Sequence, residues 1–307
     1  MKQEQPTLVA IHCLVYNHEP YHRDCLEGFV MQQTNFPFVA IVHDDASTDH
    51  SADIIREYAA KYPDIIHPIY ETENQWSKSD GSLTKIMDDA IDATGAKYVA
   101  ICEGDDYWTD PLKLQKQVDF LEEHSDYSMC FHRCKTLMVD TGEMRNEFLV
   151  RDLPYESSIY QLAQGNYIHT LSVVYRKYND IFSKRNALGP CMPGDYVLWM
   201  LLAEHGKIWK FEEFMGVYRY GCGIWTAEHN YIKQQMKTLE TFSKLYVVLS
   251  DAKAKDILYR QILNIEQVVS TEFGHIIRDY RIIKNSKAYQ LGKFLLSPFA
   301  WLRRKLK

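Results

Sequence analysis

The sequence has no apolar run approaching the roughly 18 residues that a membrane-spanning helix needs. It also has no internal repeat and no low-complexity linker, which argues against a solenoid or a disordered chain. The formal net charge of −6 excludes the broadly basic surface typical of nucleic-acid-binding proteins. The composition, 46% hydrophobic and 25% charged over 307 residues, is that of a globular protein able to bury a large core.

Cysteine is uncommon, and the spacing of the seven residues indicates no disulfide framework. They are Cys13, Cys25, Cys102, Cys130, Cys134, Cys191 and Cys222. The number is odd and no CxxC pair occurs. The group Cys130, His132 and Cys134 lacks the second ligand pair of a typical zinc site. We therefore expect small, buried thiols in a reducing compartment. The first 17 residues lack the cleavage site of a signal peptide, so the prediction is a cytoplasmic protein.

Short apolar runs alternate with helical patterns through the first half of the chain. Strands are expected at residues 7–15, 38–43, 65–70 and 97–102. Helices are expected at residues 21–33, 51–62, 83–94 and 111–124. Continuous apolar strands separated by helices indicate a mostly parallel sheet covered on both faces. The fold class is therefore α/β, and ligands of such sheets bind beyond the carboxyl ends of the strands.

Acidic clusters follow two of these strands directly. The first is residues 44–49 (DDASTD). Ser47 to Asp49 are explained by helix capping, but Asp44 and Asp45 still lie at the strand edge. Neighbouring carboxylates repel one another unless hydrogen-bond donors or cations are close, and a nucleoside base and ribose supply such donors. We interpret Asp44 and Asp45 as nucleotide contacts.

The second cluster is residues 103–108 (EGDDYW), with three carboxylates in four residues: Glu103, Asp105 and Asp106. Hard oxygen ligands of this kind suit Mg²⁺ or Mn²⁺ held against phosphate oxygens. A solvated acidic turn before a helix is the alternative. The preceding apolar strand and Trp108 favour a partly enclosed turn, and therefore a metal site.

Three residues further along are weaker candidates on spacing alone. Asp195 opens an apolar helix after Pro193 and Gly194, so it is either an N-cap or a general base. Arg219 follows a strand-like segment and could pair with phosphate. His169 could contact an acceptor if it lies under the metal site, although a single histidine is more often structural.

Taken in order, these segments resemble the family 2 glycosyltransferases, which have the GT-A nucleotide-sugar-binding fold. The resemblance covers roughly residues 7–226. Its segments are residues 15–17 (VYN), 31–34 (MQQT), 44–49 (DDASTD), 103–108 (EGDDYW), 194–196 (GDY), 217–219 (VYR) and 223–225 (GIW). Glu103 departs from the family's DXD pattern. The QxxRW signature of processive members is absent, which favours addition of one sugar.

The resemblance implies an inverting, metal-assisted transfer from a nucleotide sugar, most simply a UDP-sugar, to a saccharide or lipid-linked hydroxyl. Donor contacts would come from Tyr16, Asn17, Asp44, Asp45 and Asp105. Glu103, Asp105 and Asp106 would hold Mn²⁺ or Mg²⁺. Asp195 would be the base, Arg219 and His169 would assist it, and Trp225 would lie in an acceptor-side loop. A role in cell-surface polysaccharide synthesis is the family-level expectation.

The chain is expected to divide into a GT-A domain at residues 1–226 and a C-terminal helical region at residues 227–307. The segment 287–307 (KAYQLGKFLLSPFAWLRRKLK) combines apolar and basic residues, and no acidic residue occurs after Asp279. This pattern predicts an amphipathic anchor at the inner face of a membrane, although a helix packed on the domain is the alternative.

Three other functions fit parts of the sequence. A nucleotidyltransferase also uses a metal and an α/β fold, but residues 14–24 lack its glycine-rich phosphate loop. A non-catalytic nucleotide-sugar-binding protein would bind donor without turnover. An interaction module with purely superficial acidic clusters is a third possibility, in which Asp105→Asn would change neither metal nor nucleotide binding.

Overall fold

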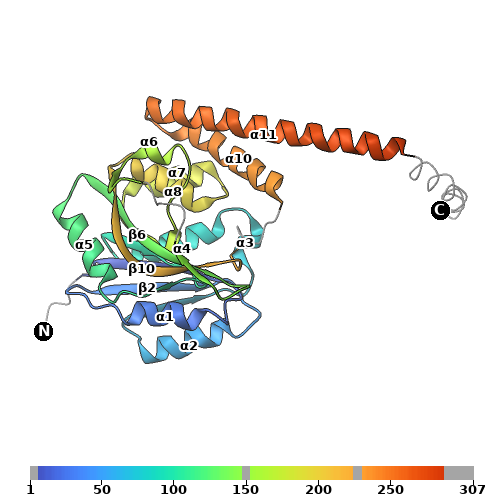
Figure 1. The fold of residues 1–307 in the computed structure, drawn as a ribbon. Helices are drawn as coiled ribbons and strands as arrows, with labels where there is room; N and C mark the ends of the chain where they lie inside the picture. The colour runs from blue at the N-terminus through green and yellow to red at the C-terminus, as the bar shows by residue number, and fades with distance from the viewer. Residues whose placement is uncertain (1–5, 147–152, 224–229, 287–307) are drawn as a thin grey trace, which may run out of the picture.

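A single curved sheet organises the protein (Figure 1). The computed structural model describes residues 6–146, 153–223 and 230–286. Within these, the strand order is β3-β2-β1-β4-β9-β6-β10-β5, with β7 paired to β6 and β8 to β10. The main strands are β1 (Val9–Val15), β2 (Phe38–Asp44), β3 (Ile66–Tyr70), β4 (Tyr98–Ile101), β6 (Tyr127–Met138), β9 (Val174–Arg176) and β10 (Lys207–Tyr220). The short strands are β5 (Tyr107–Trp108), β7 (Met144–Asn146) and β8 (Glu156–Ser157).

The predicted parallel core of the sheet is confirmed. β1 pairs in parallel with both β2 and β4, and β2 pairs in parallel with β3. The register sets Val15 opposite Asp44, so the acidic residues that follow these strands gather at one edge. β9 is antiparallel to β4 and β6. β6 therefore points the same way as β1, β2 and β4.

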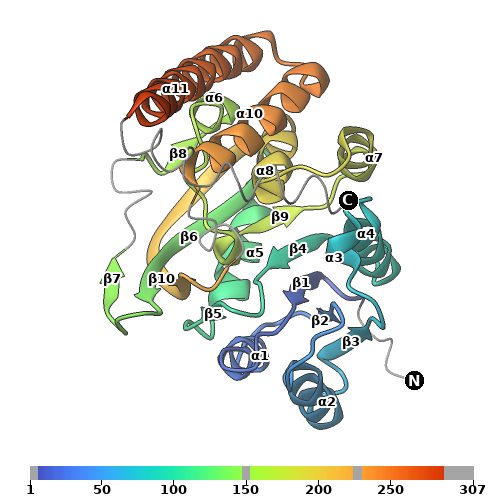
Figure 2. The same ribbon diagram turned by 90° about the vertical axis from the view of Figure 1, so that its right-hand side faces the viewer.

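Helices cover both faces of the sheet (Figure 2). One core contains buried residues of α1 (His22–Val30), α2 (Ser51–Lys61) and α5 (Lys113–Glu123). The other contains residues of α4 (Ser82–Ala93), α7 (Asn179–Leu188), α8 (Gly194–Ala203), α10 (Tyr231–Val248) and α11 (Ala252–Asn285). Successive strand residues face opposite sides, so Val9 and Ile11 enter the first core and Ala10 the second.

Two parts of the sequence interpretation need correction. The polar run at residues 71–81 has the sequence pattern of a loop, but it contains the short helix α3 (Gln75–Lys78). Four residues give too little periodicity to be recognised as a helix. The pattern at roughly residues 126–185 indicates shorter strands and loops, but β6 is long and pairs with β10 along most of its length.

The C-terminal helices pack on the body of the protein. Phe242 of α10 lies 5.1 Å from Tyr196 of α8, measured between ring centroids. The first turns of α11 bury Ala254, Leu258 and Ile262, and Figure 1 shows the rest of this helix extending past the body. In the described part of the chain, no helix combines the length and the hydropathy needed to cross a bilayer. Trp225, the boundary at residues 226–227 and the segment 287–307 lie outside the described residues.

Candidate active site

The loop after β1 is joined to the loop after β2 by reciprocal hydrogen bonds. The backbone N–H of Asn17 donates to Ser47 Oγ (2.9 Å), and Asn17 Oδ1 accepts from the backbone N–H of Thr48 (2.7 Å). Asn17 has a positive φ of 56°, a conformation that asparagine tolerates better than most residues. Asn17, predicted to contact donor, thus holds two loops together, and the neighbouring Tyr16 is 44% exposed.

Asp44 and Asp45 are both buried, but their carboxylates have different surroundings. Asp45 accepts the backbone N–H groups of Gln75 (2.6 Å) and Trp76 (3.0 Å), so it anchors α3. Asp44 Oδ2 accepts the N–H of Ser47 at 3.3 Å, whereas Oδ1 has no hydrogen-bond partner among the described residues. A buried acceptor of this kind is costly unless a ligand satisfies it. Asp44 is therefore the better candidate for a nucleotide contact.

The loop after β4 carries the second acidic cluster in a closely packed turn. A Cβ added to Gly104 would approach His18 Nδ1 to 2.8 Å and Val15 Cγ2 to 2.9 Å, so this position requires glycine. Burial, together with the charges of Asp105 and Asp195, raises the pKa of Glu103 to about 8. Burial, with a further contribution from Asp105, also raises the pKa of Asp106. The loop is thus a concentration of negative charge with too few positive partners.

Arg219, near the end of β10, contacts this acidic loop through its side chain and its backbone. Its Nη1 donates to the Asp105 carbonyl (2.7 Å), its Nη2 pairs with Asp24, and its backbone N–H donates to Asp106 Oδ1 (2.8 Å). The guanidinium carbon lies 4.5 Å from the ring centre of Tyr107 and 5.1 Å from that of Tyr21. Arg219 is 5% exposed. Arg219, predicted to pair with phosphate, thus contacts the acidic loop and holds it in position.

Asp195 lies in the first turn of α8 and faces the same acidic loop. Its Oδ2 accepts from Asn166 Nδ2 and Thr170 Oγ1, both at 3.3 Å. Burial raises its pKa, which brings the carboxyl closer to the range in which a general base works well. Because the charge of Asp195 contributes to the raised pKa of Glu103, the two carboxyl groups are electrostatic neighbours.

His169 precedes Thr170 and packs against Tyr218 with the two rings tilted, their centres 4.6 Å apart. Burial lowers its pKa to about 4, so the imidazole is neutral near pH 7. Within the described residues, its Nε2 is buried without a hydrogen-bond partner. His169 is thus a neutral side chain next to the residues that hold Asp195.

The acidic loop fits a divalent cation. Burial raises the pKa of Glu103 most, and the negative charges of Asp105 and Asp195 raise it further; a bound cation would offset both effects. Asp105 and Glu103 fit the role of ligands better than Asp106, because Asp106 Oδ1 is already held by the Arg219 N–H. Carboxylate oxygens suit Mg²⁺ and Mn²⁺.

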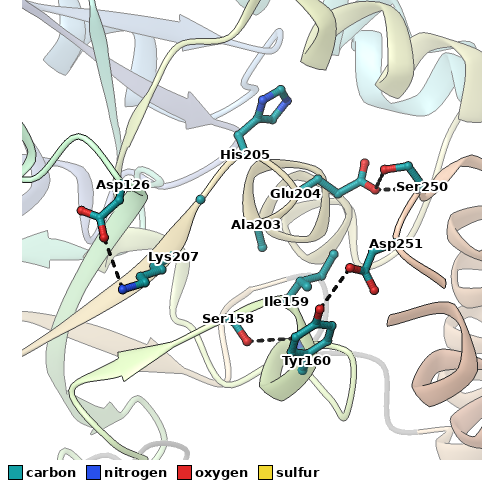
Figure 3. A pocket seen from close by; sticks show the side chains of 11 residues that line it. Asp126, Ser158, Ile159, Tyr160, Ala203, Glu204, His205, Lys207, Ser250 and Asp251 are labelled. Atoms are coloured by element: carbon teal, nitrogen blue, oxygen red, sulfur yellow. Dashed lines mark hydrogen bonds and ion pairs between the residues drawn. The ribbon is translucent and has the colours of Figure 1, made fainter. Parts of the chain in front are cut away.

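A hollow of about 450 Å³ lies at the opposite edge of the sheet, near the starts of β6 and β10 (Figure 3). Its charged groups already have partners: Lys207 pairs with Asp126 at 3.3 Å, and Glu204 accepts from Ser250 at 2.6 Å. Parallel sheets bind ligands at their carboxyl edge, which is the other edge. We therefore place the active site at the acidic loops.

Several residues of the site were not found from the sequence. Asp24 and Tyr21 act on Arg219 across almost 200 positions, and Asn166 and Thr170 reach Asp195 from another loop. No local spacing indicates such contacts. The polar run before Trp76 was the one available signal for α3, since Asn74 is its N-cap.

The curved α/β sheet, with acidic loops at its carboxyl edge, defines the GT-A class of fold. Solved structures agree. A mannosyltransferase from Pyrobaculum calidifontis, PcManGT in complex with GDP-Man and Mn²⁺, superposes with a TM-score of 0.61 at 15% identity, covering 96% of this chain and 85% of that one. Residues 1–349 of TarS from S. aureus, in complex with UDP, superpose with a TM-score of 0.59 at 17% identity, covering 84% and 71%.

Residues 11–187 match the sequence model of glycosyl transferase family 2, so the chain belongs to this family. The uncharacterized protein Rv1520 of Mycobacterium tuberculosis is 39% identical over 225 residues, which are 72% of this chain and 61% of the relative. The putative glycosyltransferase EpsE of Bacillus subtilis is 32% identical over 198 residues, 62% and 65% of the two chains. This chain thus spans about three fifths of the mycobacterial relative's length.

Proposed function

We propose that this protein is an inverting glycosyltransferase that moves one sugar from a nucleoside-diphosphate sugar to an acceptor hydroxyl. The observation that carries the proposal is the group of carboxylates at the carboxyl edge of the sheet, where burial and the charges of Asp105 and Asp195 raise the pKa of Glu103 to about 8. Such a site suits a cationic metal, a diphosphate and a base together.

The donor nucleotide would lie across the loops after β1 and β2. The unpartnered Oδ1 of Asp44 would accept a base N–H, with Tyr16 and Asn17 beside it. Asp45 would contribute by keeping α3 in place. A UDP-sugar is the favoured donor. TarS in complex with UDP supports a uridine nucleotide, while PcManGT in complex with GDP-Man keeps guanosine open to test.

Asp105 and Glu103 would hold Mn²⁺ or Mg²⁺, and the cation would supply positive charge for the leaving diphosphate. Asp106 and Arg219 would keep the loop in position rather than contact the donor. Cys222 Sγ lies 3.6 Å from Asp105 Oδ2, next to the acidic loop. Trp225, which lies outside the described residues, is proposed to contact acceptor.

Asp195 would take the proton of the acceptor hydroxyl as that oxygen attacks the sugar. Asn166 and Thr170 fix its orientation, and burial keeps its pKa raised. His169, neutral near pH 7, would form part of the acceptor surface. The acceptor is proposed to be a saccharide or a lipid-linked saccharide. The segment 287–307 is proposed to hold the enzyme at the inner membrane face.

The test is release of nucleoside diphosphate from a panel of UDP- and GDP-sugars, with and without Mn²⁺, in the presence of saccharide and lipid-linked acceptors. Asp195→Asn should lower the rate of transfer by about 10²- to 10⁴-fold while donor binding persists. A matched control is Asp126→Asn, which lies in the hollow at the opposite edge. Metal-dependent binding without turnover of any sugar would instead support a non-catalytic nucleotide-sugar-binding protein.

A further inference from the structure

A cluster of two cysteines and one histidine lies next to the acidic loop and has no part in the reaction described above. Cys13 faces α1 from β1, while His22 and Cys25 lie one turn apart on the buried face of α1. One ligand atom from each of these three residues lies within 4.8 Å of the others. All three residues are fully buried.

The imidazole of His22 has one ring nitrogen available for a metal ion. Its Nδ1 is 3.4 Å from the carbonyl oxygen of Gly104. A carbonyl can only accept, so Nδ1 carries the proton and Nε2 keeps its lone pair. Nε2 is buried and has no hydrogen-bond partner in the described part of the chain. A backbone carbonyl holding one ring nitrogen while the other binds metal is the usual arrangement around protein metal sites.

The two sulfurs are separated by a distance that suits one shared ion. Cys13 Sγ and Cys25 Sγ are 4.0 Å apart. Two thiolates on a tetrahedral zinc, each about 2.3 Å from the metal, lie about 3.8 Å apart. A disulfide would instead require about 2.05 Å.

A third thiol, Cys102, lies beside Cys25 but outside the three residues whose ligand atoms lie within 4.8 Å of one another. Cys102 Sγ and Cys25 Sγ both approach the carbonyl oxygen of Glu103, at 3.7 Å and 3.5 Å. We propose that Cys13, His22 and Cys25 form a structural zinc site, with Cys102 as the fourth ligand. Binding would release the thiol protons to solvent. The ion would fasten α1 to the loop that carries Glu103 and Asp105.

Because the cluster is buried, zinc would enter during folding. The experiment is therefore to refold the full chain from denaturant under reducing conditions, either with Zn²⁺ or with a chelator, and then to dialyse it and measure zinc. Wild type should keep about one zinc per chain. Its zinc-edge X-ray absorption should show sulfur neighbours. Asp105→Asn should keep the zinc too, which separates this site from the proposed Mn²⁺ or Mg²⁺ site.

Cys25→Ser and Cys13→Ser should lose the zinc, while Cys191→Ser, a half-buried thiol outside the cluster, should retain it. Absence of zinc from folded wild type would overturn the proposal and leave the thiols as packing residues. A zinc-edge spectrum that shows only oxygen and nitrogen neighbours, without sulfur, would also overturn the proposal. Titration of denatured wild type should find all seven thiols free. A deficit of two thiols, lost again in Cys25→Ser, would show a Cys13–Cys25 disulfide and refute the site.

Discussion

Removing the guanidinium of Arg219 should destabilise the acidic loop. Arg219→Met keeps most of the aliphatic chain but loses the hydrogen bond to the Asp105 carbonyl, the pair with Asp24 and the contacts with Tyr107 and Tyr21. A hydrogen bond from a charged donor contributes about 1.5–3 kcal/mol. A desolvated cation–π contact adds about 0.5–2 kcal/mol. The free energy of unfolding should therefore fall by about 2–4 kcal/mol.

Urea denaturation of the metal-free protein measures this change. Arg23→Met is the matched control: Arg23 lies on α1 and pairs with Glu57, but both side chains are more than half exposed, so stability should barely change. Mn²⁺ affinity of Arg219→Met should also drop by roughly tenfold or more, because each 1.4 kcal/mol spent ordering the loop costs that factor. Unchanged stability and Mn²⁺ binding with lost transfer would refute this reasoning and indicate direct contact with the donor phosphates.

Three further predictions concern the carboxylates. The pKa of Glu103 is raised to about 8, so the folded state binds an extra proton. The free energy of unfolding of the metal-free protein should therefore fall as pH rises from about 5 to about 8. Glu103→Gln should remove this pH dependence and raise the free energy of unfolding at pH 8 by on the order of 1–3 kcal/mol, measured by urea denaturation. A variant with the same pH dependence as wild type would contradict this. Asp195→Asn should lower kcat by about 10²- to 10⁴-fold with little change in KM, measured by nucleotide release. A change in KM with an unchanged kcat would exclude Asp195 as the general base. Asp44→Ala should weaken nucleotide binding in calorimetry with little loss of stability. Asp45→Ala should lower the unfolding free energy by about 1–2 kcal/mol, because only Asp45 of the two accepts backbone N–H groups of α3, those of Gln75 and Trp76. Equal behaviour of the two variants would refute the distinction.

The parallel core of the fold follows from sequence because it depends on local pattern. Residues 7–15 and 38–43 are continuous apolar runs, which are typical of strands buried on both faces of a sheet. The long β6–β10 pairing could not be foreseen in the same way, since its hydrogen bonds join residues about 80 positions apart. Turn-length elements such as α3 carry too few residues for a periodic signal.

In the site, too, features that depend on local sequence could be predicted, and those that depend on contacts distant in sequence could not. Position directly after an apolar strand was enough to select Asp44, Glu103 and Asp105. Sequence could not separate Asp44 from Asp45, because the difference lies in which backbone N–H groups each carboxylate meets. Arg219 illustrates the same limit: its residue type suits phosphate, but Asp24 and the Asp105 carbonyl, distant in sequence, already engage it.

The most direct test of the central claim is nucleotide binding that depends on both metal and acidic loop. Thermal stability should be measured with UDP, GDP, dTDP and CDP, each with and without Mn²⁺, for wild type and Asp105→Asn. At about 100 times the dissociation constant, binding adds about 2.7 kcal/mol of stability. The account predicts Mn²⁺-dependent stabilisation by one nucleotide, UDP first, which Asp105→Asn loses. Absence of a shift with all four nucleotides would contradict it.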